Sequence, residues 1–143
     1  MLSNLPFERS HVAALAEAGV DVVLNMCEDS EYRPGPREVV EAALIEYDIV
    51  EDRTCLLADL GGHPLSLLDH STRRIVQAST EGQNVVVHCR GGRERSATIA
   101  ASVLIERHGL RVSEALAVVR AIAPQADPLS NQKRALAAWQ AAR

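Results

Sequence analysis

The segment that most constrains this fold is a strand, a loop and a helix that follow one another without a break. Residues 84–88, NVVVH, hold three consecutive valines, which are typical of a short buried strand. The next seven residues, CRGGRER, carry one thiol, three arginines and two glycines. The apolar segment SATIAASVLIERHG then predicts a helix that ends at Gly109. Open α/β sheets place their binding sites at such a strand-to-helix junction.

The rest of the chain alternates in the same manner. A β-branched run predicts a strand over 20–26, "IVEDRTCLLA" predicts a second over 49–58, and "EDSEYRPGP" (28–36) predicts a surface loop. Helical spacing, with Ser113 and Asp127 as caps and Pro128 at a first helical position, predicts helices over 7–19, 36–47, 64–80, 96–109, 113–123 and 127–143. We therefore expect an α/β fold, a small and mainly parallel central sheet flanked by helices, as one domain over 1–143.

Composition narrows the classes of function. The chain has 143 residues and a formal net charge of −4, which argues against nucleic acid as a partner. It has no apolar run long enough for an integral membrane segment, and its first residues do not resemble a secretory signal. Three sparse cysteines indicate no disulfide framework. We expect a cytoplasmic location.

The loop after the valine strand predicts an anion site. Gly91 and Gly92 permit a tight turn whose backbone N–H groups can form an anion-binding nest, and the following helix N-terminus adds positive potential. Arg95 can bind phosphate oxygens in a bidentate manner. Because positive potential favours the thiolate, Cys89 is a candidate nucleophile that attacks a bound phosphate and forms a cysteinyl-phosphate. This chemistry needs no metal ion and no cofactor.

These residues carry a family resemblance. "HCRGGRERS" is similar to the HC-x5-R-[ST] signature of cysteine-dependent protein tyrosine and dual-specificity phosphatases, and the similarity covers 19–26 and 56–142. It implies a protein tyrosine phosphatase-like fold of the dual-specificity type. It also implies that Cys89 is the nucleophile and that Arg95 binds the phosphoryl group. His88 would then orient the thiolate, and Ser96 would help it leave. The implied phosphate-binding set is Arg90, Gly91, Gly92, Arg93, Glu94 and Arg95.

The resemblance also implies an upstream aspartate that protonates the leaving oxygen, and three residues compete for this role. Asp59 lies 30 positions before Cys89, and "LLAD" reads as a strand that ends in the acid. Asp52 lies 37 positions before Cys89 and needs a longer loop. Glu94 is a third candidate within the cysteine loop itself. Spacing favours Asp59.

Two other functions compete with the phosphatase. A rhodanese-like sulfurtransferase uses a similar cysteine loop, but the five-residue spacer RGGRE suits a tetrahedral phosphate better than the shorter spacer of that class. A phosphate-binding module without turnover would need a broken catalytic set. The substrate stays open among a phosphorylated protein, a phosphoinositide and another small phosphate ester, and the oligomeric state is not predicted.

Several residues are expected to have structural roles. Cys27 and Cys55 are expected to pack in the core, with a protective Cys27–Cys89 disulfide as the lesser alternative. Arg90 and Arg93 either face solvent or widen the positive field, as basic residues do in relatives that act on inositol phospholipids. The remaining expectations are a surface position for His63, solvent-facing side chains at Asn131 and Gln132, a core position for Trp139, and no extra strand pair before the first helix.

Overall fold

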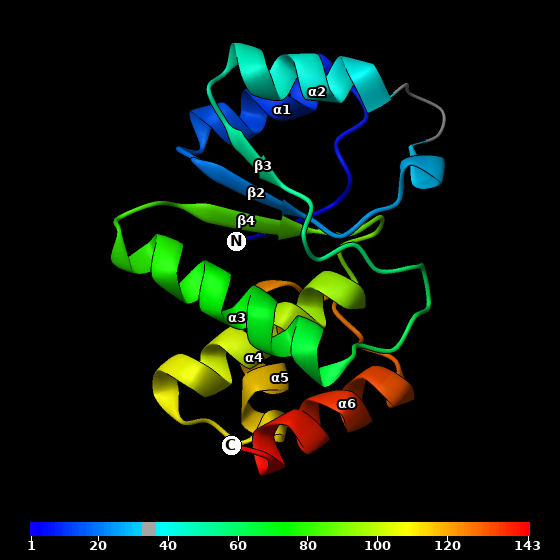
Figure 1. Cartoon of the computed structure of the whole chain (residues 1–143), viewed down its shortest axis with the longest axis vertical. Coiled ribbons are helices and arrows are strands. Elements are labelled where there is room, and N and C mark those ends of the chain that lie inside the picture. Colours follow the sequence, from blue (N-terminus) through cyan, green and yellow to red (C-terminus); the bar gives the residue numbers. More distant parts are fainter. Residues whose placement is uncertain (33–36) are drawn as a thin grey trace.

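The computed structural model describes residues 1–32 and 37–143, and a four-stranded parallel sheet lies between two layers of helices (Figure 1). The strand order is β1-β4-β2-β3. The strands are β1 (Leu2–Ser3), β2 (Val22–Asn25), β3 (Val50–Asp52) and β4 (Val85–His88). The helices are α1 (Arg9–Glu17), α2 (Arg37–Glu46), α3 (Leu65–Thr80), α4 (Arg95–His108), α5 (Val112–Ile122) and α6 (Ser130–Ala141). Helices α1 and α2 cover one face of the sheet, and α3 to α6 lie on the other (Figure 1). The α/β prediction is confirmed.

The two central strands place the predicted site at the carboxyl edge of the sheet. Strand β2 is buried along its whole length, and β4 is buried over most of its own, which explains their β-branched composition. Their parallel register pairs Val22 with Val85 and Asn25 with His88. The chain therefore leaves β4 directly at the edge where the ends of β2 and β3 also lie.

Helix α4 forms the apolar support below this edge. Its residues Ala97, Ile99 and Ala101 are fully buried, and a hydrogen bond of 2.7 Å between the hydroxyls of Thr72 and Ser102 links α3 to α4. Gly109 ends the helix in the left-handed conformation (φ 64°), as its position predicts. Trp139 of α6 is 3% exposed, which confirms its predicted core position.

The predicted strand over 49–58 is wrong beyond Asp52. One carboxylate oxygen of Asp52 accepts hydrogen bonds from the backbone N–H (2.9 Å) and the hydroxyl (2.6 Å) of Thr54, which turn the chain away from the sheet. Asp59 therefore does not end a strand. It lies in the irregular connection 53–64 between β3 and α3, which we call the acid loop.

The predicted caps Ser113 and Asp127 are wrong, because other residues cap these two helices. Helix α5 begins at Val112, since the Glu114 carboxylate accepts the Arg111 N–H at 2.8 Å. Helix α6 begins at Ser130, and the side chain of Gln132 accepts the Leu129 N–H at 3.0 Å. The Asp127 carboxylate instead pairs with the side chains of Arg120 in α5 and Lys133 in α6, so it is not the predicted cap.

The predicted loop 28–36 and the N-terminal residues differ from expectation. Residues 33–36, and with them the first position of the helix predicted over 36–47, lie outside the described residues. Residues 29–31 form a 3₁₀ turn, and Glu31 and Tyr32 are buried rather than on the surface. At the N-terminus, Leu2–Ser3 pairs with β4, so the first residues add one edge strand. Within the described residues no helix is long and apolar enough to cross a membrane.

Candidate active site

The loop from Cys89 to Arg95, here called the cysteine loop, joins β4 to α4 and is held from outside by two segments. The Leu5 N–H donates to the Arg90 carbonyl at 3.1 Å, and the Asp127 N–H donates to the Arg93 carbonyl at 2.7 Å. Gly92 has a φ of +64°, and a Cβ there would lie 2.9 Å from Asn4 Oδ1. Glycine is therefore required at 92 both for backbone conformation and for close approach of the N-terminal segment.

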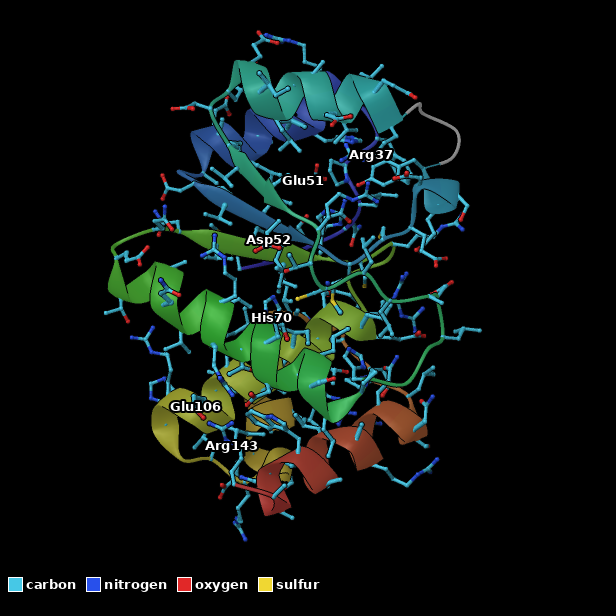
Figure 2. All side chains as sticks on the ribbon, in the orientation of Figure 1. Arg37, Glu51, Asp52, His70, Glu106 and Arg143 are labelled. Carbon is cyan, nitrogen blue, oxygen red and sulfur yellow. The ribbon has the colours of Figure 1, made fainter. Side chains whose placement is uncertain are left out.

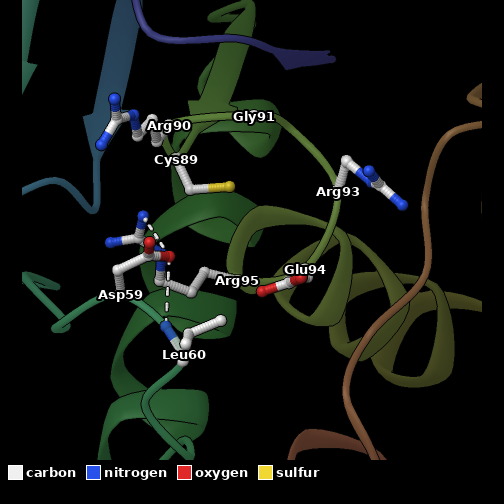
Figure 3. Close-up of a pocket in the computed structure, with 8 residues that line it drawn as sticks. All are labelled: Asp59, Leu60, Cys89, Arg90, Gly91, Arg93, Glu94 and Arg95. Atoms are coloured by element: carbon white, nitrogen blue, oxygen red, sulfur yellow. Dashed lines mark hydrogen bonds and ion pairs between the residues drawn. The ribbon is translucent and has the colours of Figure 1, made fainter.

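A pocket of about 270 Å³ opens over the cysteine loop (Figure 3). Cys89 lies in this pocket and is 3% exposed. Its Sγ is 3.2 Å from the hydroxyl of Ser96 in α4. Arg90 and Arg93 project from opposite sides of the loop (Figure 3). The lining residues are Asp59, Leu60, Cys89, Arg90, Gly91, Arg93, Glu94 and Arg95, so the predicted nucleophile, arginine and two of the three candidate acids meet in one pocket.

Arg95 is held by the carboxylate of Glu31, which was not among the predicted site residues. Arg95 Nη1 donates to Glu31 Oε2 at 2.9 Å and Nη2 donates to Oε1 at 2.6 Å, in a bidentate pair that is almost fully buried. Burial opposes ionisation of Glu31, but the hydrogen bonds and charge of Arg95 outweigh it and lower the pKa of this carboxyl. The signal available in the sequence was an acidic residue in the connection after buried strand β2, at the sheet edge where β4 also ends.

A polar network fixes the segment that carries Glu31. The Asn25 side-chain amide donates to the Tyr32 hydroxyl at 2.6 Å and to Glu51 Oε1 at 2.8 Å. Arg37 forms a largely buried ion pair with Glu51 (Figure 2), and its guanidinium lies over the Tyr32 ring at 5.3 Å. The end of β2 and the start of α2 thus hold the residues next to Glu31 in place.

The guanidinium of Arg95 has one donor free for a ligand. Nη1 also donates to the Leu57 carbonyl at 2.7 Å, and Nη2 lies 3.2 Å from Asp59 Oδ1. Nε–H is buried and has no hydrogen-bond partner within residues 1–32 and 37–143. A buried donor without a partner is rare, and here it marks a position that an anion in the pocket can satisfy.

The structure separates the candidate acids. Asp59 lies at the mouth of the pocket with its side chain half exposed, where it also accepts the Leu60 N–H at 3.1 Å. Glu94 lines the pocket immediately before α4. Asp52 does not line the pocket. Its carboxylate is occupied by Thr54 and, at 3.0 Å, by Arg74 Nε of α3.

Asp52 is also held in its ionised form. Burial opposes this, but the hydrogen bonds from Thr54 and Arg74 outweigh it and lower the pKa of the Asp52 carboxyl. An ionised carboxylate outside the pocket is poorly suited to donate a proton to a leaving group, so the geometry favours Asp59 over Asp52.

Two histidines are buried around the cysteine loop. His88 is 1% exposed at the end of β4, and burial lowers its pKa to about 4. His63 is 3% exposed, so its predicted surface position is wrong. Its Nε2 lies 3.1 Å from the Arg95 carbonyl, and burial lowers its pKa to about 4 as well. Both imidazoles are therefore neutral at neutral pH.

The other two cysteines are unsuited to nucleophilic chemistry. Cys27 and Cys55 are fully buried, and all three cysteines are free thiols. Burial, with the Glu31 charge, raises the pKa of Cys27 to about 12, and burial also raises the pKa of Cys55. The predicted core positions of both residues are confirmed.

This strand–loop–helix, with its cysteine and arginine in one pocket, has the layout of the cysteine-dependent phosphatases that the sequence resembles. A model of the family "Dual specificity phosphatase, catalytic domain" matches residues 6–142. The chain belongs to this family, which is a family of hydrolases.

Curated relatives and solved structures agree with this membership. Dual specificity phosphatase 28 of Homo sapiens is 29% identical over 114 residues, which cover 80% of this chain. Dual specificity protein phosphatase 1B of Arabidopsis thaliana is 43% identical over 54 residues, 38% of this chain and 32% of that protein. The chain spans 58% of the length of the human relative.

The fold likeness extends over nearly the whole chain. The crystal structure of PTPMT1 in complex with PI(5)P has a TM-score of 0.85 and 23% sequence identity, and covers 99% of this chain and 89% of that one. The structure of Tk-PTP in the active form has a TM-score of 0.84 and 25% identity, and covers 97% of this chain and 89% of that one.

Proposed function

We propose that this protein is a metal-independent phosphomonoesterase that works through a cysteinyl-phosphate on Cys89. The observation that carries the proposal is the meeting of Cys89 Sγ, the unpaired Nε–H of Arg95 and the Asp59 carboxyl around one pocket. Arg95 and the loop amides supply the positive charge that the equatorial phosphate oxygens need.

In the first step, Cys89 Sγ forms a bond to phosphorus while the bond from phosphorus to the ester oxygen breaks. Asp59 donates its proton to that oxygen, so the leaving group departs as a neutral alcohol or phenol. In the second step, water attacks phosphorus, Asp59 takes the proton of the water, and the S–P bond breaks. Ser96, whose hydroxyl is 3.2 Å from Cys89 Sγ, stabilises the departing thiolate.

The substrate class is supported by charge around the pocket. Arg90 and Arg93 are exposed and form no ion pair with any residue in the described part of the chain, so they extend the positive potential beyond the pocket. Phosphate esters with additional negative charge near the phosphate should therefore bind better than esters whose remaining part is neutral. A phosphoinositide headgroup, as bound by PTPMT1, and a phosphorylated acidic peptide both have this property.

The test is hydrolysis of an aryl phosphate by wild type, Cys89→Ser and Cys55→Ser, with EDTA and a thiol reductant present. We expect turnover by wild type and Cys55→Ser and none by Cys89→Ser. Inactive wild type that still binds phosphate would instead indicate a binding module. Release of thiocyanate from thiosulfate and cyanide would indicate a sulfurtransferase.

A further inference from the structure

Helix α6, which supplies no lining residue of the catalytic pocket, reaches the acid loop through Gln132. Gln132 is fully buried, so its predicted solvent-facing position is wrong. Its Nε2 donates to the Gly61 carbonyl at 3.0 Å, and its Oε1 accepts the Leu129 N–H at 3.0 Å. Gln132 therefore joins the first turn of α6 to a loop residue only two positions after Asp59.

The part of the acid loop that Gln132 holds has a strained backbone. Leu60 has a φ of +62°, a left-handed conformation that costs a non-glycine residue about 1 kcal/mol or more. A hydrogen bond of 2.9 Å from the Gly61 N–H to the Ala58 carbonyl closes a tight turn around Asp59 and Leu60. Such a conformation persists only where surrounding contacts impose it.

Within the turn, the Asp59 carboxylate pairs with Arg95 Nη2 at 3.2 Å, and the contacts that anchor the loop on either side involve Leu57 and His63. The Leu57 carbonyl accepts from Arg95 Nη1, and His63 Nε2 lies 3.1 Å from the Arg95 carbonyl. Between these two anchors, the shortest hydrogen bond that the described residues outside the loop make to its backbone runs from Gln132 Nε2 to the Gly61 carbonyl, at 3.0 Å. Asn131 Nδ2 approaches the Leu60 carbonyl only at 3.5 Å.

We propose that Gln132 is a positioning residue for Asp59, a role that rests on the proposed function. By holding the Gly61 carbonyl, Gln132 fixes the turn that places the Asp59 carboxyl over the pocket. Its loss would leave Cys89 and Arg95 intact but let Asp59 move away from the leaving oxygen. The defect should therefore resemble loss of the general acid rather than loss of the nucleophile.

A positioning role for Gln132 can be distinguished from a purely structural one, because the hydrogen bonds of its side chain to Leu129 and to Gly61 can be changed independently. Gln132→Glu keeps an oxygen that accepts the Leu129 N–H, and glutamate is favoured at this helix position. It removes the donor to Gly61 and sets a carboxylate oxygen against that carbonyl. The matched control is Gln140→Glu, because Gln140 Nε2 of the same helix donates to the Leu110 carbonyl at 2.8 Å.

The experiment compares wild type, Gln132→Glu and Gln140→Glu on phenyl phosphate and on 4-nitrophenyl phosphate. For Gln132→Glu we expect kcat/KM to fall about tenfold or more on phenyl phosphate and much less on the activated ester, since general acid catalysis contributes about 10²–10⁴. Gln140→Glu should leave both values near wild type. Amide hydrogen exchange should show faster exchange over residues 57–63 in Gln132→Glu alone.

Equal loss on both esters, or exchange over 57–63 that matches wild type, would overturn the positioning role while leaving the phosphatase proposal intact. No turnover by wild type on either ester would instead overturn the proposed function, and the role of Gln132 in the acid step with it. In that case hydrogen exchange would still decide whether Gln132 holds the loop.

Discussion

Arg95 is the residue through which three parts of the site are joined. Its guanidinium binds Glu31 after β2 and Asp59 on the acid loop, and its backbone carbonyl contacts His63. A role for Arg95 in anion binding could be predicted from the sequence, because the residue stands in a recognisable motif. Its partner Glu31 could not, because no local pattern connects residues 64 positions apart.

The Arg95–Glu31 pair gives a first prediction. Glu31→Gln removes one charge from a buried ion pair, which should cost about 3 kcal/mol of unfolding free energy and weaken phosphate binding. Chemical denaturation and competitive inhibition by inorganic phosphate measure the two effects. The control is Glu46→Gln, which disrupts the exposed Arg9–Glu46 pair and should change little. Equal stability of the two variants would contradict a stabilising role for the buried Arg95–Glu31 pair.

The two loop glycines give a second prediction, because their surroundings differ. Gly92→Ala places a Cβ 2.9 Å from Asn4 Oδ1 on a left-handed backbone, and should destabilise the protein by about 1–3 kcal/mol. Gly91→Ala would meet only the Arg93 side chain at 3.7 Å and should unfold like wild type. Denaturant midpoints test this difference. Two variants with the same midpoint would refute the requirement for glycine at 92.

Among the elements, the acid loop carries Asp59, the carboxyl that we propose protonates the leaving group. Asp59→Asn should lower the rate on phenyl phosphate by about 10²-fold or more and affect 4-nitrophenyl phosphate less. Asp52→Asn should leave this leaving-group dependence unchanged, because Asp52 binds Thr54 and Arg74 outside the pocket. Steady-state kinetics on both esters test the assignment. A leaving-group effect confined to Asp52→Asn would reverse it.

Regular elements were predictable from the sequence where periodicity decides the structure. The valine strand, the helix ending at Gly109 and the buried β2 follow from local composition, and the motif then placed Cys89 and Arg95 correctly at the sheet edge. The first part of the acid loop was wrongly predicted as a strand, because its apolar residues lack the regular backbone hydrogen bonds that pair strands in a sheet. The side-chain hydrogen bonds that shape it, from Thr54 to Asp52 and from Gln132 to Gly61, join residues that sequence patterns do not connect.

At the scale of the whole molecule, two buried neutral histidines link stability to pH. Burial lowers the pKa of His63 and His88 to about 4, whereas an unfolded histidine titrates near 6.5. The unfolded state therefore binds more protons below about pH 6.5, and stability should decrease as pH falls from there toward 4. Protonation of Glu31 and Asp52, whose carboxyl pKa values are lowered, should reduce stability further, but only at more acidic pH.

Melting temperatures between pH 8 and pH 4.5 test this linkage. We expect the melting temperature to be constant at neutral pH and to decline from about pH 6.5 downward. The free energy of unfolding should fall by at most about 1.4 kcal/mol per pH unit for each histidine. His63→Gln should reduce the decline, whereas His108→Gln at the exposed end of α4 should not. A melting temperature that is constant down to pH 5 would contradict the burial of two neutral imidazoles.

If phosphate passes through a covalent bond to Cys89, rapid acid quenching during turnover of an aryl phosphate should trap it on the protein. We expect protein-bound phosphate that peptide mapping places on Cys89 in wild type, a larger amount in Asp59→Asn with an activated ester, and none in Cys89→Ser. Turnover by wild type without protein-bound phosphate, or phosphate bound to another residue, would contradict a covalent bond to Cys89.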